Sequence, residues 1–195
     1  MNYLCYRLQG VESVTTGLSG LTDEEQAFPP LRRMARYLLK QELARRTGQQ
    51  ADDIRFTYNE HGKPLLDGVH FNASHSGEMI CLAFHSDDIG IDIQKENPRT
   101  PIQKLAPKIM CEAQLQRFRE QREPISQFFQ AWCIMEALVK CEGATVWNAA
   151  NYPFIIYPDH VKLLFSSSIA VELFTPAEGY YGAVAYKLLT CPSEQ

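Results

Sequence analysis

The sequence predicts a protein of the α+β class, in which helices and strands occupy separate stretches of the chain. A helical pattern followed by several short strands occurs twice along the 195 residues, with the division near positions 88 to 95. The strand patterns are short and are separated by turn residues. A hydrophobic content of 45% is sufficient to form a core.

The first predicted helix begins at Pro29-Pro30 and ends before Gly48. Proline is tolerated in the first turn of a helix, and glycine commonly follows the last turn. Apolar residues recur at positions 31, 34, 35, 38, 39 and 43, which predicts one buried stripe. The other faces carry six cations, balanced on the helix only by Glu42: Arg32, Arg33, Arg36, Lys40, Arg45 and Arg46. Such charges are ordinarily solvated, and a binding site for phosphate or for an acidic partner is the competing explanation.

Short strands follow the first helix, and a second set of helices and strands fills the rest of the chain. The expected strands of the first set are 54–58, 71–74, 79–84 and 89–93. A loop follows Asn97-Pro98, and helices are expected over 109–122 and 125–142, the second closed by Gly143. The strands expected after them are 154–157, 161–165, 169–174 and 180–188.

The bulk composition excludes several classes of protein. A net charge of −4 without a long basic run makes nucleic acid an unsuitable partner. The apolar runs, such as 79–84, fall far short of the roughly 20 residues of a membrane-spanning helix, so no membrane association is expected. The start of the chain lacks a basic segment followed by an apolar one, and a cytoplasmic location is expected by default.

The six cysteines are expected to be reduced residues of the core. They stand at positions 5, 81, 111, 133, 141 and 191 and form no C-x-x-C pair. Most of them have apolar neighbours, which argues against a zinc site or a disulfide framework.

Asp92 lies in the apolar segment Ile89-Gly90-Ile91-Asp92-Ile93. The alternating isoleucines face a core, so Asp92 shares the opposite face of the strand with Gly90. An acidic side chain in such a strand must be paired, hydrogen-bonded or bound to a metal. A capped strand end or a buried ion pair is the structural explanation. A metal ligand is the functional one, since Mg²⁺ prefers carboxylate and phosphate oxygens.

Glu136 and Lys140 share one face of the second long helix. In a helix, positions 129, 132, 133, 136 and 140 fall on that face. The opposite side is apolar as well, and a helix that is apolar on nearly all sides is buried. A Glu-Lys pair spaced i, i+4 is usually an exposed ion pair that stabilises a helix only weakly. Burial therefore favours a functional role for these two side chains.

Four short segments in fixed order connect these candidates with a known family. They are Gly62-Lys63-Pro64, Phe71-Asn72-Ala73-Ser74-His75-Ser76, Gly90-Ile91-Asp92-Ile93, and Phe129-Gln130-Ala131-Trp132 leading into Glu136 and Lys140. Together they resemble the surfactin-type 4'-phosphopantetheinyl transferases, over residues 31 to 143. The resemblance implies Mg²⁺-dependent transfer of phosphopantetheine from coenzyme A to a serine of an apo acyl or peptidyl carrier protein, with release of 3',5'-ADP.

The same resemblance implies a pseudo-dimer of two similar α+β halves, each with a small antiparallel sheet and a long helix, and an active site in the cleft between them. Residues 1–89 would form the N-terminal half, which binds coenzyme A. Residues 90–195 would form the C-terminal half, which carries the metal and catalytic residues. Because both halves belong to one chain, a monomer is expected.

Metal and catalytic roles follow from the resemblance by matching position. Asp92 and Glu136 correspond to the metal ligands, and Gln94 stands where many members have a further acidic ligand. Lys140 corresponds to a lysine that pairs with phosphate. The general base for the serine proton is Glu136 or, as the second candidate, Glu112.

The residues implied for coenzyme A lie in the first half of the chain. Lys63 corresponds to a lysine that reaches the coenzyme A phosphates, and Ser74 and His75 to residues that hold the nucleotide phosphates. A structural histidine at a strand end is the alternative for His75. The basic first helix, with Arg36 and Lys40, is expected to hold the 3'-phosphate or to provide a docking face for an acidic carrier protein.

Two positions depart from the family pattern. The amide of Gln94 can donate an oxygen, but it removes one negative charge from the metal site and should weaken Mg²⁺ binding. Met135 stands where a lysine usually precedes the helix glutamate, so one cation near the phosphates is missing. A weakened or inactive relative that binds coenzyme A or a carrier protein is therefore the alternative. A metal-dependent phosphohydrolase is a weaker one, because no further Asp or His cluster suggests a two-metal site.

Overall fold

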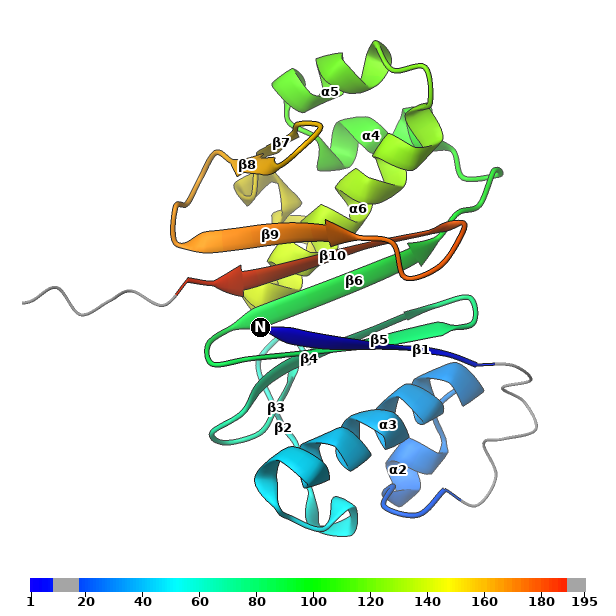
Figure 1. Cartoon of the computed structure of the whole chain (residues 1–195), viewed down its shortest axis with the longest axis vertical. Coiled ribbons are helices and arrows are strands. Elements are labelled where there is room, and N and C mark those ends of the chain that lie inside the picture. The colour runs from blue at the N-terminus through cyan, green and yellow to red at the C-terminus, as the bar shows by residue number, and fades with distance from the viewer. Residues whose placement is uncertain (9–17, 189–195) are drawn as a thin grey trace, which may run out of the picture.

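Two three-stranded antiparallel sheets, each with an 18-residue helix packed against it, make up most of the computed structural model (Figure 1). The structure describes residues 1–8 and 18–188. The strand order is β1-β5-β4 in the first sheet and β6-β10-β9 in the second. The chain is thus of the predicted α+β class.

The first sheet comprises β1 (Asn2–Arg7), β4 (His70–Ser76) and β5 (Met79–His85), and helix α3 (Pro30–Thr47) packs against it. Gly48 ends α3 in the left-handed conformation with φ at 75° and donates its N–H to the carbonyl of Ala44. The apolar stripe of α3 contributes to a buried core with the sheet: Met34, Ala35, Leu39 and Leu43 of the helix, and Phe71, Ile80, Leu82 and Phe84 of the strands.

Short elements complete this part of the chain. They are α2 (Asp23–Gln26), the 3-10 turn η1 (Ala51–Asp53), and the two-residue strands β2 (Thr57–Tyr58) and β3 (Pro64–Leu65), which pair with each other. Helix α2 begins with a capping box, in which the Thr22 hydroxyl accepts from the N–H of Glu25 and the Glu25 carboxylate accepts from the N–H of Thr22.

The second sheet comprises β6 (Ile89–Lys95), β9 (Ile169–Phe174) and β10 (Tyr180–Lys187), and helix α6 (Pro124–Cys141) packs against it. Gly90 permits the close approach of β6 and α6, because a Cβ at this position would lie 2.0 Å from the carbonyl oxygen of Ala137. Around α6 lie α4 (Ile102–Ile109), α5 (Glu112–Arg119), η2 (Val146–Asn151) and the hairpin of β7 (Phe154–Ile156) and β8 (Val161–Leu163).

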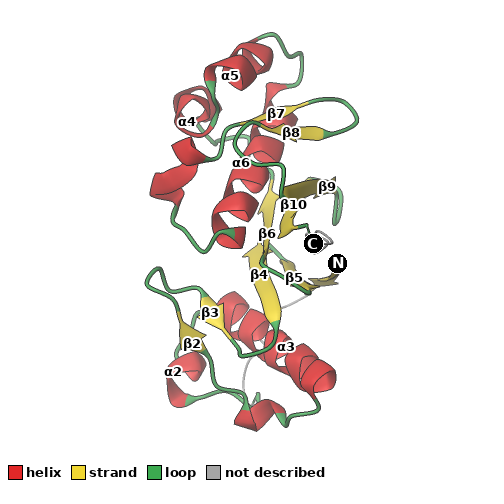
Figure 2. Ribbon diagram, turned by 90° about the vertical axis from the view of Figure 1, so that its left-hand side faces the viewer, coloured by secondary structure: helices red, strands yellow, loops and turns green. Residues whose placement is uncertain are grey.

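Side chains of β4 join the two sheets where β4 lies beside β6 (Figure 2). The Asn72 Oδ1 atom accepts the N–H of Ile91 at 3.0 Å, and the Ser74 hydroxyl accepts the N–H of Ile93 at 3.3 Å. The Ser76 hydroxyl accepts the N–H of Lys95 at 2.9 Å in the same way. Alternate residues of β4 thus form a ladder with alternate amides of β6, as the twofold period of a strand allows. A third apolar cluster, built from β5, β6 and β10, fills the space beside this ladder.

Several predicted elements are confirmed. The two long helices are α3 and α6, and the strands expected at 71–74, 79–84 and 89–93 are β4, β5 and β6. The four expected C-terminal strands are β7 to β10.

Other predictions need correction. The single helix expected over 109–122 is α5 alone, because the backbone turns to an extended conformation at Met110, and α4 precedes it where a loop was expected. The strand expected over 54–58 is reduced to β2, because only Thr57 and Tyr58 find pairing partners, Leu65 and Pro64 of β3. Strand β1 and helix α2 were not predicted.

The cysteine prediction is wrong for one pair. Cys5 and Cys81 face each other across the β1–β5 ladder and form a disulfide, with 4.2 Å between their Cα atoms. Only the register of the unpredicted strand β1 brings them together. Cys133 and Cys141 are buried free thiols, as expected, and Cys111 is a half-buried one. Cys191 lies outside the described residues.

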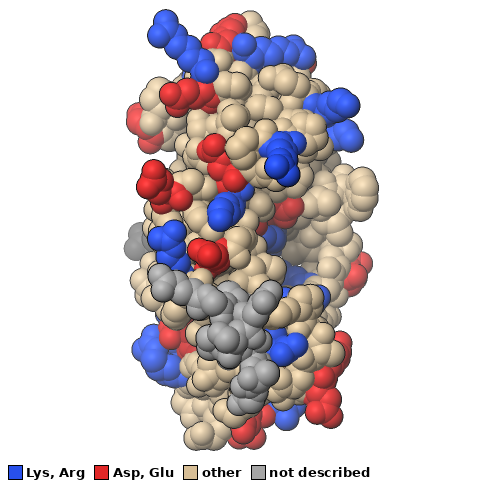
Figure 3. All heavy atoms as spheres, turned by 90° about the vertical axis from the view of Figure 1, so that its right-hand side faces the viewer, with Lys and Arg blue, Asp and Glu red and all other residues tan. Residues whose placement is uncertain are grey.

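The surface has no single dominant charge on the face drawn in Figure 3, where Lys and Arg side chains alternate with Asp and Glu. Within residues 1–8 and 18–188, no helix combines the length and the apolar character needed to cross a membrane.

Candidate active site

Asp92 is the buried centre of a group of polar side chains between β4, β6 and α6. Its side chain is 2% exposed. The Oδ1 atom accepts the ammonium of Lys140 at 2.6 Å and the Ser74 hydroxyl at 2.7 Å. The Oδ2 atom accepts the amide of Gln94 at 3.0 Å. These three donors and the positive charge of Lys140 provide the pairing that a buried carboxylate requires.

Glu136 lies one turn before Lys140 on α6 and is half-buried. Burial raises the pKa of its carboxyl group, the charge of Lys140 acts in the opposite direction, and the charge of Asp92 raises the pKa further. The charge of Asp92 thus acts on Glu136, which places the two carboxylates in one electrostatic environment. Two carboxylates with a nearby amide oxygen form a donor set that suits a hard divalent cation.

Gln94 contacts Asp92 through its amide nitrogen. In this arrangement it holds the Asp92 carboxylate in place as a hydrogen-bond donor. Met135, the other departure from the family pattern, is 1% exposed within the core of the second sheet and α6, so its position brings no charge to the site.

Ser74 and His75 lie at the same junction on adjacent positions of β4. Ser74 is 6% exposed and is engaged by Asp92 and the amide of Ile93. His75 is exposed, yet the protein around it desolvates the ring and lowers its pKa, and the charges of Lys140 and Arg32 lower that pKa further. Arg32, at the start of α3, and Lys140 therefore lie close enough to His75 to act on it electrostatically.

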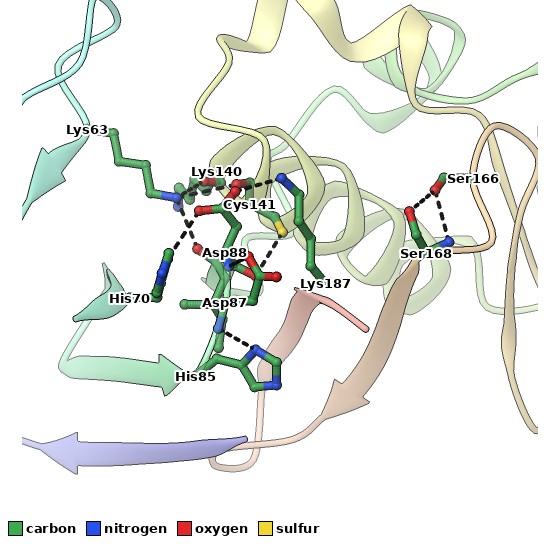
Figure 4. A network of polar contacts seen from close by, with 11 residues as sticks. Lys63, His70, His85, Asp87, Asp88, Lys140, Cys141, Ser166, Ser168 and Lys187 are labelled. Carbon is green, nitrogen blue, oxygen red and sulfur yellow. Dashed lines mark hydrogen bonds and ion pairs between the residues drawn. The ribbon is translucent and has the colours of Figure 1, made fainter. Parts of the chain in front are cut away.

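Lys63 makes a different set of contacts from the one expected of it (Figure 4). Its ammonium donates to the backbone carbonyl of Lys140 at 2.6 Å, of Ile89 at 3.2 Å and of Cys141 at 3.4 Å. Burial lowers the pKa of Lys63, although nearby acidic groups oppose the shift. Lys63 thus caps the carbonyls at the C-terminal end of α6. A contact with coenzyme A phosphates would require these bonds to break.

The predicted roles of Arg36 and Lys40 in binding are not supported by their positions. Lys40 is fully buried, and its ammonium donates to Glu25 at 2.7 Å and to the carbonyl of Gly20 at 2.8 Å. Arg36 is 8% exposed, lies 3.6 Å from Glu25, and stacks on Phe56 with 4.4 Å to the ring centroid. Both cations therefore pair with Glu25 inside the protein, because α2 supplies a carboxylate that the sequence pattern of α3 did not include.

Glu112 lies outside the group around Asp92. It begins α5, its side chain is 83% exposed, and its ion-pair partner is Arg119 at 3.7 Å. Helix α5 lies at the far end of the molecule from β4 (Figure 1). The structure therefore brings together Asp92, Glu136, Gln94, Lys140, Ser74 and His75, and leaves Glu112 apart from them.

A second group of metal-ligating side chains was not anticipated. His70, Asp87 and Asp88 place one ligand atom each within 4.8 Å of one another. Asp88 already pairs with Lys187 at 2.6 Å and with His70 at 3.2 Å (Figure 4). Burial raises the pKa of Asp88, but the hydrogen bond and charge of Lys187 outweigh it and lower the pKa overall. The ammonium of Lys187 thus balances the negative charge of Asp88 in this cluster.

Sequence reasoning also missed the role of Asn72 and Ser76 in joining β4 to β6. Their spacing from Ser74 was a usable signal, because polar residues at i, i+2 and i+4 of a strand share one face. Nothing in the local sequence indicated that the partner of this face is the backbone of β6.

Comparisons with known proteins bear on this group of residues. Residues 88–178 match the family model of the 4'-phosphopantetheinyl transferase superfamily. The chain is 32% identical over 111 residues to the 4'-phosphopantetheinyl transferase Sfp of Bacillus subtilis (strain 168), covering 54% of this chain and 49% of that protein. It is 35% identical over 149 residues to the 4'-phosphopantetheinyl transferase ffp of Bacillus subtilis, covering 71% and 63%.

A more distant relative matches a longer part of the chain. The 4'-phosphopantetheinyl transferase HetI of Nostoc sp. (strain PCC 7120 / SAG 25.82 / UTEX 2576) is 27% identical over 173 residues, which is 81% of this chain and 72% of that protein. The chain spans about half the length of Sfp and less than two thirds of ffp. The matched segments include β6 and α6, which carry Asp92, Glu136 and Lys140.

Proposed function

We propose, since this chain belongs to the 4'-phosphopantetheinyl transferase superfamily, that it transfers the 4'-phosphopantetheine group of coenzyme A to a serine of an apo acyl or peptidyl carrier protein, releasing 3',5'-ADP. The observation that carries the proposal is that the half-buried Glu136 and Lys140 act on the buried carboxylate of Asp92, Lys140 through an ion pair and Glu136 through its charge. The relatives, which are named 4'-phosphopantetheinyl transferases, support the reaction type.

Asp92 and Glu136 would hold Mg²⁺, with the amide oxygen of Gln94 as a further donor after rotation of the amide. When bound, the ion supplies positive charge to neutralise the pyrophosphate of coenzyme A. Lys140 adds a fixed positive charge beside Asp92, where negative charge develops during phosphoryl transfer. Glu136, whose pKa is raised, accepts the proton of the carrier serine more readily than an ordinary exposed carboxylate.

We place the coenzyme A phosphates near His75 and Arg32. His75 lies on β4 beside the group around Asp92, and the charge of Arg32, at the start of α3, acts on it. Arg32 is exposed, whereas Arg36 and Lys40 are buried against Glu25. A phosphate therefore has access to Arg32 and His75 from solvent.

The proposal includes a pseudo-dimer whose halves are residues 1–89 and 90–195, with the site in the cleft between them. It is supported by the repeated plan of one three-stranded sheet with one 18-residue helix. Ser74 and His75 come from the first half, and Asp92, Glu136 and Lys140 come from the second. Because one chain supplies both groups, we propose that a monomer is sufficient for activity.

Intact-mass spectrometry of apo carrier proteins, incubated with this protein, coenzyme A and Mg²⁺, tests the reaction. A mass gain of one phosphopantetheine that EDTA abolishes is expected. Glu136→Gln should lower the initial rate of transfer by at least about 100-fold. The amide that replaces the carboxylate can serve neither as a charged metal ligand nor as a base. Glu112→Gln is the matched control and should retain full activity, since Glu112 is exposed on α5. Unchanged transfer by folded Glu136→Gln would refute the assignment.

A second candidate function rests on Gln94 and Met135. The amide of Gln94 adds no negative charge at the metal site, and Met135 adds no cation. Such a site could bind coenzyme A or a carrier protein without transfer. Coenzyme A binding by calorimetry, with no mass gain on any carrier in a broad panel, would select this candidate.

A further inference from the structure

Two side chains of the turn between β2 and β3 reach the C-terminal end of α6, 77 or more residues further along the chain. The Asn59 Nδ2 atom donates to the carbonyl of Gly143 at 2.8 Å. The ammonium of Lys63 donates to the carbonyls of Lys140 and Cys141 (Figure 4). The turn thus contacts both the last residues of α6 and the glycine that follows its C-cap.

The turn is closed by the same asparagine. The Asn59 Oδ1 atom accepts the N–H of His61 at 3.0 Å and the N–H of Lys63 at 2.8 Å. The backbone N–H of Asn59 donates to the carbonyl of Lys63 at 3.1 Å. Because the side-chain oxygen of Asn59 closes the turn while its nitrogen binds Gly143, this residue fixes the place of Lys63 relative to α6.

The backbone after α6 suits this contact. Gly143 has a φ of 64°, in the left-handed region that favours glycine. A Cβ at this position would lie 2.9 Å from the Nδ2 atom of Asn59, which is too close for an undisturbed contact. A glycine is therefore required here both by the conformation of the chain and by the approach of Asn59.

Lys63 also ties α6 to the strand that carries Asp92. Its ammonium donates to the carbonyl of Ile89 on β6 at 3.2 Å and to that of Lys140 on α6 at 2.6 Å. The side chain of Lys140 in turn donates to Asp92 at 2.6 Å, three residues after Ile89 on β6. One ammonium group therefore holds the backbone of Lys140 and the strand that carries its ion-pair partner.

We propose that Asn59 and Lys63 are positioning residues for the transfer reaction. They hold the last turn of α6 against β6, so that Lys140 and Glu136, one turn earlier, keep their place beside Asp92. A displacement of about 1 Å in groups that stabilise developing charge costs about 100-fold in rate. The role rests on the proposed function, and it differs from the contact with coenzyme A phosphates that the resemblance implies for Lys63.

The two roles of Lys63 predict different changes in kinetics. A lysine that binds the phosphates of coenzyme A contributes before the chemical step, so its loss raises the KM for coenzyme A. A lysine that only positions α6 touches no substrate. Its loss lowers kcat, because the charged groups of the site are then misplaced, and leaves the KM for coenzyme A unchanged.

The test compares Lys63→Met, Lys63→Arg and Asn59→Asp by steady-state kinetics of transfer from coenzyme A to an apo carrier protein. Methionine removes the donor at similar length, and arginine restores a charged donor. Aspartate keeps the acceptor that closes the turn but has no N–H for Gly143. The matched controls are Lys162→Met, at an exposed lysine of β8, and Asn97→Asp, where Oδ1 accepts a backbone N–H two residues further on.

Lys63→Met should lower kcat about tenfold with the KM for coenzyme A changed by less than about twofold, and Lys63→Arg should recover kcat to within about threefold of the unmodified protein. Asn59→Asp should lower kcat about fivefold, and both controls should retain full activity. The amides of Glu142, Gly143 and Ala144 donate to carbonyls of α6. Their hydrogen exchange should be faster in Lys63→Met and Asn59→Asp.

Three results would overturn the proposal. They are a raised KM for coenzyme A with unchanged kcat in Lys63→Met, an unchanged kcat in both Lys63→Met and Asn59→Asp, and unchanged hydrogen exchange at the end of α6. The first would place Lys63 on the coenzyme A phosphates. Should Lys63→Met not fold, Asn59→Asp decides by the same criteria.

Failure of the proposed function gives a different result. An unmodified protein that transfers no phosphopantetheine to any carrier would refute the transfer reaction. Unchanged hydrogen exchange at the end of α6 in Lys63→Met and Asn59→Asp would refute the positioning role, whether or not transfer is observed.

Discussion

At the scale of single residues, charge balance around Asp92 decides what the site can bind. Asp92 receives three hydrogen bonds, and one of its donors, Lys140, carries a full positive charge. Gln94 contributes a dipole where a carboxylate would contribute a negative charge. A divalent cation bound at the proposed site would meet two carboxylates, and the ammonium of Lys140 would oppose its binding.

Replacing Gln94 by glutamate should strengthen Mg²⁺ binding. The added carboxylate supplies a third negative charge, and we expect the Mg²⁺ concentration for half-maximal transfer to fall about tenfold. Titration of the transfer rate with Mg²⁺, checked by calorimetry without coenzyme A, measures the effect. Gln94→Ala serves as the control and should not increase Mg²⁺ affinity. Equal Mg²⁺ affinities for Gln94→Glu and the unmodified protein would place the metal elsewhere.

Glu136 should reduce stability at neutral pH in the absence of metal. Its folded-state pKa is raised, so its contribution to stability is present below the ordinary value of 4.5 and is lost as pH rises through the folded value. The free energy of unfolding of Glu136→Gln, relative to that of the unmodified protein, should therefore be larger at pH 8 than at pH 4. Urea denaturation in EDTA at both pH values measures this difference. A difference that does not change with pH would contradict the assigned burial of the carboxylate.

At the scale of elements, α3 owes its position to α2 as well as to its apolar stripe. Glu25 of α2 pairs with Lys40 and Arg36, so two of the six cations of α3 are buried within the protein. Glu42 pairs with Arg45 and Arg46 at 2.7 Å each. Four of the six cations of α3 are thus paired with two carboxylates in the folded chain, and Arg32 is exposed at its start.

Lys40→Met should destabilise the protein by about 3 kcal/mol, because it leaves the Glu25 carboxylate buried without its closest cation. The double variant Lys40→Met with Glu25→Gln should recover part of this loss, since no unpaired charge remains. Urea denaturation of the single and double variants measures the coupling. The KM for coenzyme A should not change. A raised KM with unchanged stability would instead support the predicted contact between Lys40 and coenzyme A.

The same ion pair should make stability depend on pH. Burial alone would raise the pKa of Glu25, but hydrogen bonds from Lys40 and Thr22 and the charges of Lys40 and Arg36 lower it overall. Its contribution is therefore present above the ordinary value of 4.5 and is lost as pH falls through the folded value. The unfolding temperature of the unmodified protein should fall from pH 7 to pH 3, and Glu25→Gln should make this fall smaller. An equal fall in unfolding temperature for the two proteins would contradict a lowered pKa of Glu25 in the folded protein.

At the scale of the whole molecule, the junction between the sheets depends on side chains of β4 instead of a continuous backbone ladder. Asn72, Ser74 and Ser76 bind three amides of β6. The same Ser74 hydroxyl donates to Asp92, so the junction and the candidate site share an atom. Changes in the relative position of the sheets would therefore displace Asp92 from its partners.

Asn72→Ala should cost about 1 to 3 kcal/mol, because the buried N–H of Ile91 loses its acceptor. Ser76→Ala is the matched control and should cost less, since the bond from Lys95 to Ser76 is exposed to water. Urea denaturation of both variants measures the difference. Equal losses of stability would show that burial of the hydrogen bonds between β4 and β6 does not determine how much they stabilise the protein.

The sequence by itself determined the α+β class, both long helices, most strands and the segments that identify the family. These depend on local periodicity, capping residues and short motifs, which are contained in neighbouring positions of the chain. Asp92, Glu136 and Lys140 became candidate site residues in this way, because an acidic residue in an apolar strand and an ionic pair on a buried helix stand out in the local sequence.

Only the tertiary structure decided which groups meet. It paired Lys40 with Glu25, directed Lys63 to the end of α6, joined Cys5 to Cys81 and left Glu112 on the surface. Each of the three pairings joins segments that are distant in sequence, and Glu112 depends on where the whole of α5 lies. The physical reason is that a charged or polar side chain has many possible partners of equal chemistry. Packing of the helices and sheets selects among them, and local sequence carries no record of that choice.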